Sequence, residues 1–222
     1  MTTLGIAVIG QAPRSDIQAL FQAALPTGGR TILRGCLDGL SDAEVEAIPP
    51  RDGADTLYTR LRGERDVKIS KAAVIARAPD VLAGLRSDGC DAIVFACTGE
   101  FPPLAGDAGV VFPSRVLSAL AAGLLPTGRL GLLVPATEQI EKLAAKWRRP
   151  GVEVVAEALL PSCSLEDAAE AAQRLVRLRP DLVAMDCMSY TPAAKAVVRR
   201  EVSVPTVLAV TATARVLQEL LN

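Results

Sequence analysis

The chain of 222 residues holds 24 basic and 25 acidic side chains, giving a net charge of −1 at pH 7, and 50% of its residues are hydrophobic. This composition is typical of a well-packed globular protein and excludes the disordered and fibrous classes. No block of like charges occurs and only 3% of the residues are aromatic, which argues against nucleic acid and an anionic membrane surface as partners.

Residues 1–10 predict a strand rather than a signal peptide, and no apolar run approaches the roughly 20 residues that cross a bilayer. The five cysteines are widely spaced and form no CxxC pair, so we expect no disulfide framework, no zinc site and a cytoplasmic location. The chain contains no histidine, which excludes Ser-His-Asp and Cys-His catalysis and histidine-bound metals. The absence of a P-loop, and of GxGxxG after the first strand, argues against a nucleotide cofactor.

Short apolar runs alternate with helical periodicities, which predicts βα units around parallel sheets. The predicted strands are Leu4–Ile9, Thr31–Leu33, Ala92–Ala96, Val110–Phe112, Leu130–Val134, Val152–Val155, Leu182–Met185 and Thr206–Val210. The predicted helices are Ile17–Ala24, Ala72–Arg86, Val116–Leu124, Ile140–Trp147, Leu165–Leu178 and Ala212–Leu221. Several strands are almost continuously apolar, as expected for strands covered on both faces. Ser41 and Ser164 stand where a helix begins, and Glu44 completes a capping box with Ser41.

The chain divides into two halves that each open with a similar apolar strand, Leu4–Ile9 and Leu130–Val134. The polar segment Pro49–Asp66 interrupts the βα rhythm of the first half, and we expect it to form a lid or an excursion over a cleft. We therefore predict two pseudo-symmetric α/β domains with a cleft between them. Residues 1–113 with about 206–222 would form the first domain, and about 114–205 the second.

Cys97 and Cys187 are the candidate catalytic residues. Each ends an apolar run that an Asp begins six residues earlier, and the two cysteines stand 90 residues apart. Ligands of parallel α/β sheets gather at the carboxyl ends of the strands, where both thiols would lie. One thiolate would remove a proton from a carbon acid while the other thiol returns one. The alternative is that each cysteine is a small buried hydrophobe. Cys36, Cys90 and Cys163 have no matched partner, and we interpret them as structural.

Several neighbours of these cysteines are candidates for substrate binding. Backbone amides in the turns at Thr98, Gly99 and Ser189 can face an anion, although ordinary turn chemistry explains these residues equally well. Glu100 and Tyr190 follow the two cysteines and are expected to line the cleft.

Two arginines also stand at the ends of predicted strands. Arg14 and Arg115 each carry a planar fork that suits a carboxylate, but a solvated surface arginine is the alternative. Ser15 or Asp16 is expected to cap the helix after Arg14. Asp186 points away from its neighbour Cys187 if the strand continues, and we expect it to pair with an arginine.

The chain resembles the AroM family along essentially its whole length. The motifs that carry the resemblance include IGQAPRSD around Arg14, ACTGEF around Cys97, PSRVL around Arg115, KW at 146–147 and MDCMSY around Cys187. More distantly, the strand-end cysteines resemble the aspartate/glutamate/hydantoin racemase superfamily. This resemblance implies two pseudo-symmetric α/β domains, catalysis without a cofactor, and Cys97 and Cys187 as paired thiols. It also implies that Thr98 and the loop after Cys187 hold a substrate carboxylate. The chain departs from the superfamily pattern at Met188 and in lacking histidine.

The resulting hypothesis is a cofactor-independent isomerase of the racemase type, acting at a carbon next to a carboxylate. Its ligand would be a small carboxylate-bearing metabolite, and a homodimer is possible. The alternatives are a binding or sensor protein of the same fold without turnover, and a lyase or decarboxylase that uses one cysteine.

Overall fold

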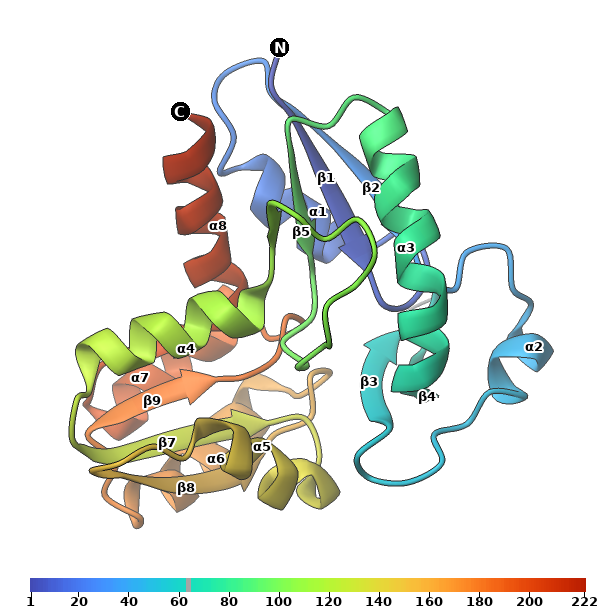
Figure 1. Cartoon of the computed structure of the whole chain (residues 1–222). Coiled ribbons are helices and arrows are strands. Elements are labelled where there is room, and N and C mark those ends of the chain that lie inside the picture. Colours follow the sequence, from blue (N-terminus) through green and yellow to red (C-terminus); the bar gives the residue numbers. More distant parts are fainter. Residues whose placement is uncertain (63–64) are drawn as a thin grey trace. The chain divides into compact units, whose positions relative to one another are not determined.

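A four-stranded parallel sheet forms the centre of each half of the chain in the computed structural model, which describes residues 1–62 and 65–222 (Figure 1). The chain divides into two compact units. The first unit comprises Met1–Pro113 and Ala214–Asn222, and the second unit comprises Ser114–Thr213. Each unit is an α/β structure, as the alternation of apolar runs and helical periodicities predicts.

The sheet of the first unit has the strand order β2-β1-β5-β6. These strands are β1 (Thr3–Val8), β2 (Arg30–Gly35), β5 (Ala92–Phe95) and β6 (Val110–Val111). Its helices are α1 (Ser15–Gln22), α2 (Asp42–Glu46) and α3 (Lys71–Ser87), followed at the end of the chain by part of α8 (Ala209–Leu221). Every residue of β1 is buried, and α3 packs against β1 and β2. The apolar character of β1 therefore reflects burial on both faces, as predicted.

The sheet of the second unit has the strand order β10-β9-β7-β8. These strands are β7 (Gly128–Val134), β8 (Val152–Ala158), β9 (Leu182–Met185) and β10 (Thr206–Leu208). The helical elements are α4 (Pro113–Leu124), the 3₁₀ turn η2 (Thr137–Gln139), α5 (Ile140–Trp147), α6 (Leu165–Val176) and α7 (Pro192–Val202). All residues of β9 are buried.

The predicted strands and helices are confirmed within a few residues at their ends, and β9 and α5 have the predicted bounds. Both predicted helix starts carry a capping box, in which the Ser41 and Ser164 hydroxyls accept from the backbone N–H groups of Glu44 and Asp167. Helix α7 was missed, although Thr191 caps it and Pro192 occupies its first turn. Residues 206–213 lie in the second unit, where β10 pairs with β9, whereas the predicted first domain includes them.

The segment Pro49–Asp66 contains the first strand of a β-hairpin that is not among the predicted elements. Strand β3 (Thr56–Arg60) pairs in antiparallel register with β4 (Asp66–Ser70), and Arg60 forms an ion pair with Asp66 at 2.9 Å. Gly63 and Glu64 of this segment lie outside the described residues. The alternating burial of β3 leaves Tyr58 and Arg60 partly exposed and buries their neighbours, which is the pattern of a strand with one covered face.

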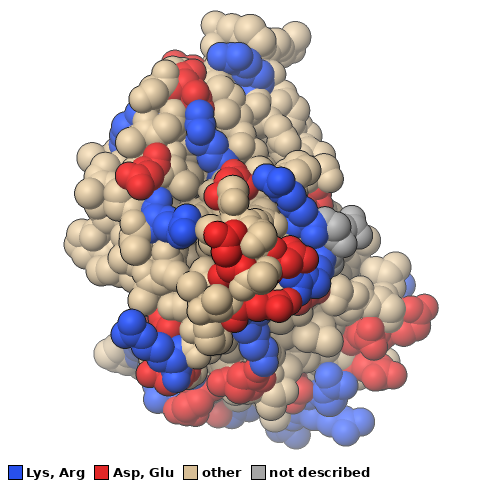
Figure 2. Space-filling model, turned by 90° about the vertical axis from the view of Figure 1, so that its right-hand side faces the viewer, with Lys and Arg blue, Asp and Glu red and all other residues tan. Residues whose placement is uncertain are grey.

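Acidic and basic side chains lie next to one another over the charged part of the face shown in Figure 2, in keeping with the net charge of −1. Within residues 1–62 and 65–222, none of the helices combines the length and the apolar character needed to cross a membrane.

Candidate functional site

Cys97 lies just beyond the carboxyl end of β5 in the first unit. Its backbone N–H donates to the carbonyl of Phe95 at 2.7 Å, so the chain turns sharply where the strand ends. The side chain is 8% exposed and packs in the apolar core that includes Leu57 and Phe95. The Gly99 N–H points back to the Cys97 sulfur at 3.3 Å. A backbone N–H in this position is a donor that a thiolate can accept from.

The β3–β4 hairpin packs against the same edge of the first sheet. A Cβ atom at Gly10, just after β1, would lie 2.6 Å from both the Arg60 carbonyl oxygen and the Thr59 hydroxyl oxygen. A Cβ atom at Gly99 would lie 3.1 Å from Leu57. The polar segment predicted to form a lid therefore lies across the strand ends of its own unit, and the two glycines permit its close approach.

Arg14 lies in the loop after β1, but it is not a solvated surface arginine. Its side chain is 5% exposed, and its guanidinium donates two hydrogen bonds to the Asp16 carboxylate at 3.0 and 2.8 Å. Burial alone would raise the pKa of Asp16, but the hydrogen bond and the charge of Arg14 bring that pKa below its ordinary value. The expectation that Ser15 or Asp16 occupies the cap position of α1 is wrong, because Arg14 stands there without a side-chain cap hydrogen bond and the helix begins at Ser15.

The second unit repeats the arrangement around Cys187, which lies just beyond the carboxyl end of β9. The side chain is 7% exposed, and the Ser189 N–H points to its sulfur at 3.5 Å. In both units the amide two residues after the cysteine thus faces the sulfur. The two cysteines, which stand at matching positions in the sequence, therefore also lie in turns with the same N–H···S contact.

A buried ion pair adjoins Cys187 in the second unit. The Asp186 side chain is fully buried and accepts from Lys146 Nζ, itself 3% exposed, at 2.8 and 3.1 Å. The Trp147 indole N–H donates to the same carboxylate at 2.8 Å. The prediction that Asp186 pairs with an arginine is wrong, since its cationic partner is a lysine from the last turn of α5. The network holds the end of β9 against α5, and a buried pair with these additional hydrogen bonds keeps its geometry.

The other candidate binding residues differ in their surroundings. Thr98 is 8% exposed, and Ser189 is partly buried. Glu100 is exposed in the loop after Cys97, and Arg115 is exposed in the first turn of α4 in the second unit. Tyr190 is 1% exposed and its hydroxyl donates to the Leu159 carbonyl. Tyr190 thus anchors the loop after Cys187 rather than presenting its hydroxyl to a ligand.

Cys36 follows β2 and is a neighbour of the first-unit site. Burial raises the pKa of the Cys36 thiol to about 12, and negative charge at Cys97 and at Asp38 acts in the same direction. The neutral thiol is therefore the stable form in the folded chain, which agrees with its interpretation as structural.

The raised pKa of Cys36 predicts a loss of stability in alkali. The unfolded chain releases this proton near pH 9 and the folded chain near pH 12, so the stabilisation is complete below pH 9 and is lost as pH rises toward 12. We expect about 1 kcal/mol of this loss between pH 9 and pH 10. Urea unfolding at these two pH values measures it, and Cys36→Ala should show a smaller decrease than the wild type. An equal decrease in both proteins would contradict the prediction.

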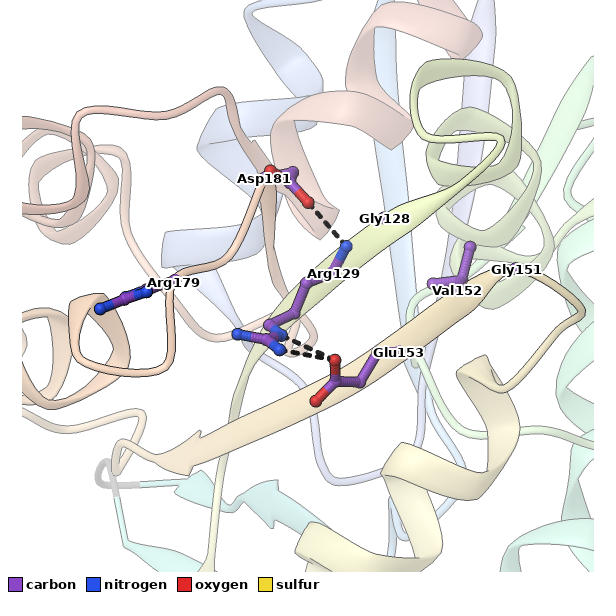
Figure 3. Close-up of a pocket in the computed structure, with 7 residues that line it drawn as sticks. All are labelled: Gly128, Arg129, Gly151, Val152, Glu153, Arg179 and Asp181. Atoms are coloured by element: carbon purple, nitrogen blue, oxygen red, sulfur yellow. Dashed lines mark hydrogen bonds and ion pairs between the residues drawn. The ribbon is translucent and has the colours of Figure 1, made fainter.

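A hollow of about 680 Å³ lies at the opposite edge of the second sheet, at the amino ends of β7 and β8 (Figure 3). In Figure 3, Arg129 pairs with Glu153 at 2.7 Å and its backbone N–H donates to Asp181, whereas Arg179 has no drawn contact with the other labelled residues. Because ligands of parallel sheets bind at carboxyl ends, we place the candidate site at the cysteines rather than in this hollow.

The model of a known protein family matches this chain over residues 4–221 and is described as AroM protein. The chain belongs to the AroM family. A search of curated proteins found no match for it.

Solved structures similar to this AroM family member share its fold at low sequence identity. Arylmalonate decarboxylase is 16% identical with a TM-score of 0.63, covering 97% of this chain and 92% of that chain. The maleate isomerase Iso from Pseudomonas putida S16 is 13% identical with a TM-score of 0.65, covering 99% and 92%. Glutamate racemase from Francisella tularensis subsp. tularensis SCHU S4, in complex with D-glutamate, is 15% identical with a TM-score of 0.59, covering 99% and 81%. The chain therefore has the fold of the aspartate/glutamate racemase superfamily.

Lys146 and Trp147 are neighbours of the Cys187 strand that the sequence does not predict. In the sequence they stand out only as a motif of the AroM family, because no local pattern links them to Asp186, which lies 40 residues from Lys146. Among the described residues, no group of three or more His, Cys, Asp or Glu side chains is arranged to bind a metal ion.

Proposed function

We propose that the protein is a cofactor-independent isomerase of the racemase or epimerase type, acting at a carbon next to a carboxylate. The thiolate of one cysteine, Cys97 or Cys187, removes the proton from that carbon, and the electron pair passes into the carboxylate as an enediolate. The thiol of the other cysteine then protonates the opposite face. The first sulfur ends as a thiol and the second as a thiolate, so the same groups catalyse the reverse reaction.

The observation that carries this proposal is the repeated sulfur contact. In each unit a backbone N–H two residues after the cysteine faces the sulfur, at 3.3 Å for Cys97 and 3.5 Å for Cys187. Fixed amide dipoles of this kind stabilise an anion without having to reorganise. A structural cysteine needs no such donor, and its appearance at both strand ends favours a chemical role for both thiols.

The substrate carboxylate needs its own donors, because a proton next to a carboxylate is weakly acidic and the enediolate must be strongly stabilised. We assign this role to Thr98 and to the turns that contain Gly99 and Ser189, whose own backbone N–H groups face the two sulfurs. Arg14 and Arg115 supply positive charge, Arg14 within its pair with Asp16. Glu100 is assigned to the rim of the site, whereas Tyr190 positions the loop after Cys187.

Deuterium exchange tests the proposal across many acids at once, so a single substrate need not be chosen beforehand. The full chain is incubated in D2O with a panel of 2-hydroxy and 2-amino acids, and NMR and chiral chromatography follow each acid. Deuterium at the carbon next to the carboxylate, together with inversion, is the expected result for at least one acid. Binding without exchange would replace the proposal with the sensor, and CO2 release would replace it with a decarboxylase.

A further inference from the structure

Gln139 of the second unit carries an unpaired buried oxygen. Its side chain is 7% exposed, and its Oε1 is the buried side-chain nitrogen or oxygen atom without a hydrogen-bond partner in the described part of the chain. Buried polar groups in native proteins are almost always paired, because an unpaired one costs free energy. An acceptor kept in this state is a candidate for pairing with a ligand.

Gln139 also lies at the edge of the sheet where Cys187 lies. It ends η2, the turn that follows the carboxyl end of β7, and its backbone N–H donates to the Ala136 carbonyl at 3.0 Å. Strand β7 pairs with β9, and the Asp186 N–H donates to the Leu133 carbonyl at 2.9 Å. The ends of these two strands therefore lie side by side, one leading to Gln139 and the other to Cys187.

A buried glutamine of the first unit shows the contacts of a structural role. Gln11 follows β1 and is 3% exposed, but its amide nitrogen donates to the carbonyls of Leu37 and Leu40 at 3.3 and 2.8 Å. Its Oε1 accepts from the Arg62 N–H at 3.4 Å. Gln11 thus holds three backbone groups in place, whereas the oxygen of Gln139 holds none among the residues that the structure describes.

We propose that Gln139 Oε1 accepts a hydrogen bond from the 2-hydroxyl group of the substrate, which makes 2-hydroxy acids the substrate class. This inference rests on the proposed function, since it places Gln139 beside the reacting carbon. The hydroxyl donates a hydrogen bond to Oε1, keeps its proton and stays neutral throughout. A 2-ammonium group fits less well, because removing its charge from water costs more than one neutral acceptor returns.

Matched acids that differ only in the hydroxyl test the proposal. Calorimetry on the full chain compares lactate with propionate and malate with succinate. We expect the hydroxy acid of at least one pair to bind about tenfold more tightly, since an analogue that lacks the hydroxyl leaves Oε1 unpaired. Gln139→Met keeps the length of the side chain and should remove this preference. Equal affinity within both pairs, no binding of any acid, or a preference that survives in Gln139→Met would overturn the inference. A larger gain for alanine or aspartate would overturn the hydroxyl assignment.

Stability measurements on the same proteins provide the matched control. Gln139→Met should raise the urea midpoint, because it deletes a buried acceptor that has no partner among the described residues. Gln11→Met should lower it, because the Leu40 carbonyl and the Arg62 N–H lose their Gln11 partner and the Leu37 carbonyl keeps only the Leu40 N–H. A fall in Gln139→Met as large as that in Gln11→Met would show a structural partner and overturn the inference. Deuterium exchange in D2O separates the two proposals. If the wild type exchanges no acid, the result counts against the isomerase. If the wild type exchanges an acid but Gln139→Met keeps the preference for the hydroxy acid, the result counts against the role of Gln139 alone.

Discussion

Serine in place of Cys97 or Cys187 is expected to reduce the rate of substrate inversion by about 10²–10⁴-fold, the usual contribution of one acid–base group. Inversion needs one group to take the proton and another to return it, so neither variant can complete the cycle. A serine hydroxyl occupies nearly the same space but is a far weaker acid than a thiol at neutral pH. Chiral chromatography of the acid identified by deuterium exchange measures the loss.

The two variants should differ in the exchange that they retain. In Cys97→Ser the remaining thiol faces one side of the carbon, so deuterium still enters one enantiomer without inversion. In Cys187→Ser the opposite enantiomer retains exchange. Cys163→Ser is the control, because Cys163 lies outside both strand-end turns and should leave inversion unchanged. Full inversion in either strand-end variant would contradict the two-thiol mechanism, and dependence on one cysteine alone would favour the lyase.

The parts of the fold that are predictable from the sequence are those that local patterns encode. The run Leu182–Met185 consists of apolar residues alone and predicts β9, and the amphipathic period of Ile140–Trp147 predicts α5. The same rule finds Cys187, because it stands where an apolar run ends. Strand β3 is not predictable in this way, because apolar and polar residues alternate only weakly along it. It forms a strand by pairing with β4 and packing over Gly10 and Gly99.

The unpredicted features of the candidate site depend on contacts between distant segments. Whether a charged residue is buried and paired depends on the element that covers it, so Asp186 was matched to the wrong cation. Arg14 has its partner only two residues away, but its burial is a tertiary property. Gln139 offers no signal at all, because its distinguishing property is the absence of a hydrogen bond within the described part of the chain, and sequence patterns report residue types and spacing.

Asp186→Asn is expected to lower the free energy of unfolding of the second unit by about 3–5 kcal/mol. Asparagine keeps the shape of aspartate and can still accept from the Trp147 indole, but it removes the buried negative charge that faces Lys146. Trp147 is the single tryptophan of the chain and is 2% exposed, so its fluorescence in a urea titration reports the environment of this network directly.

The same helix supplies the control for this prediction. Glu141 forms an ion pair with Arg148 at 2.8 Å, but their side chains are 83% and 61% exposed, so Glu141→Gln should cost less than about 1 kcal/mol. Adding Lys146→Met to Asp186→Asn should restore part of the lost stability, because the buried positive charge is then removed together with the negative one. A loss in Asp186→Asn no larger than that in Glu141→Gln would mean that the buried pair does not hold β9 against α5. The position of Cys187 would then depend on its own turn alone.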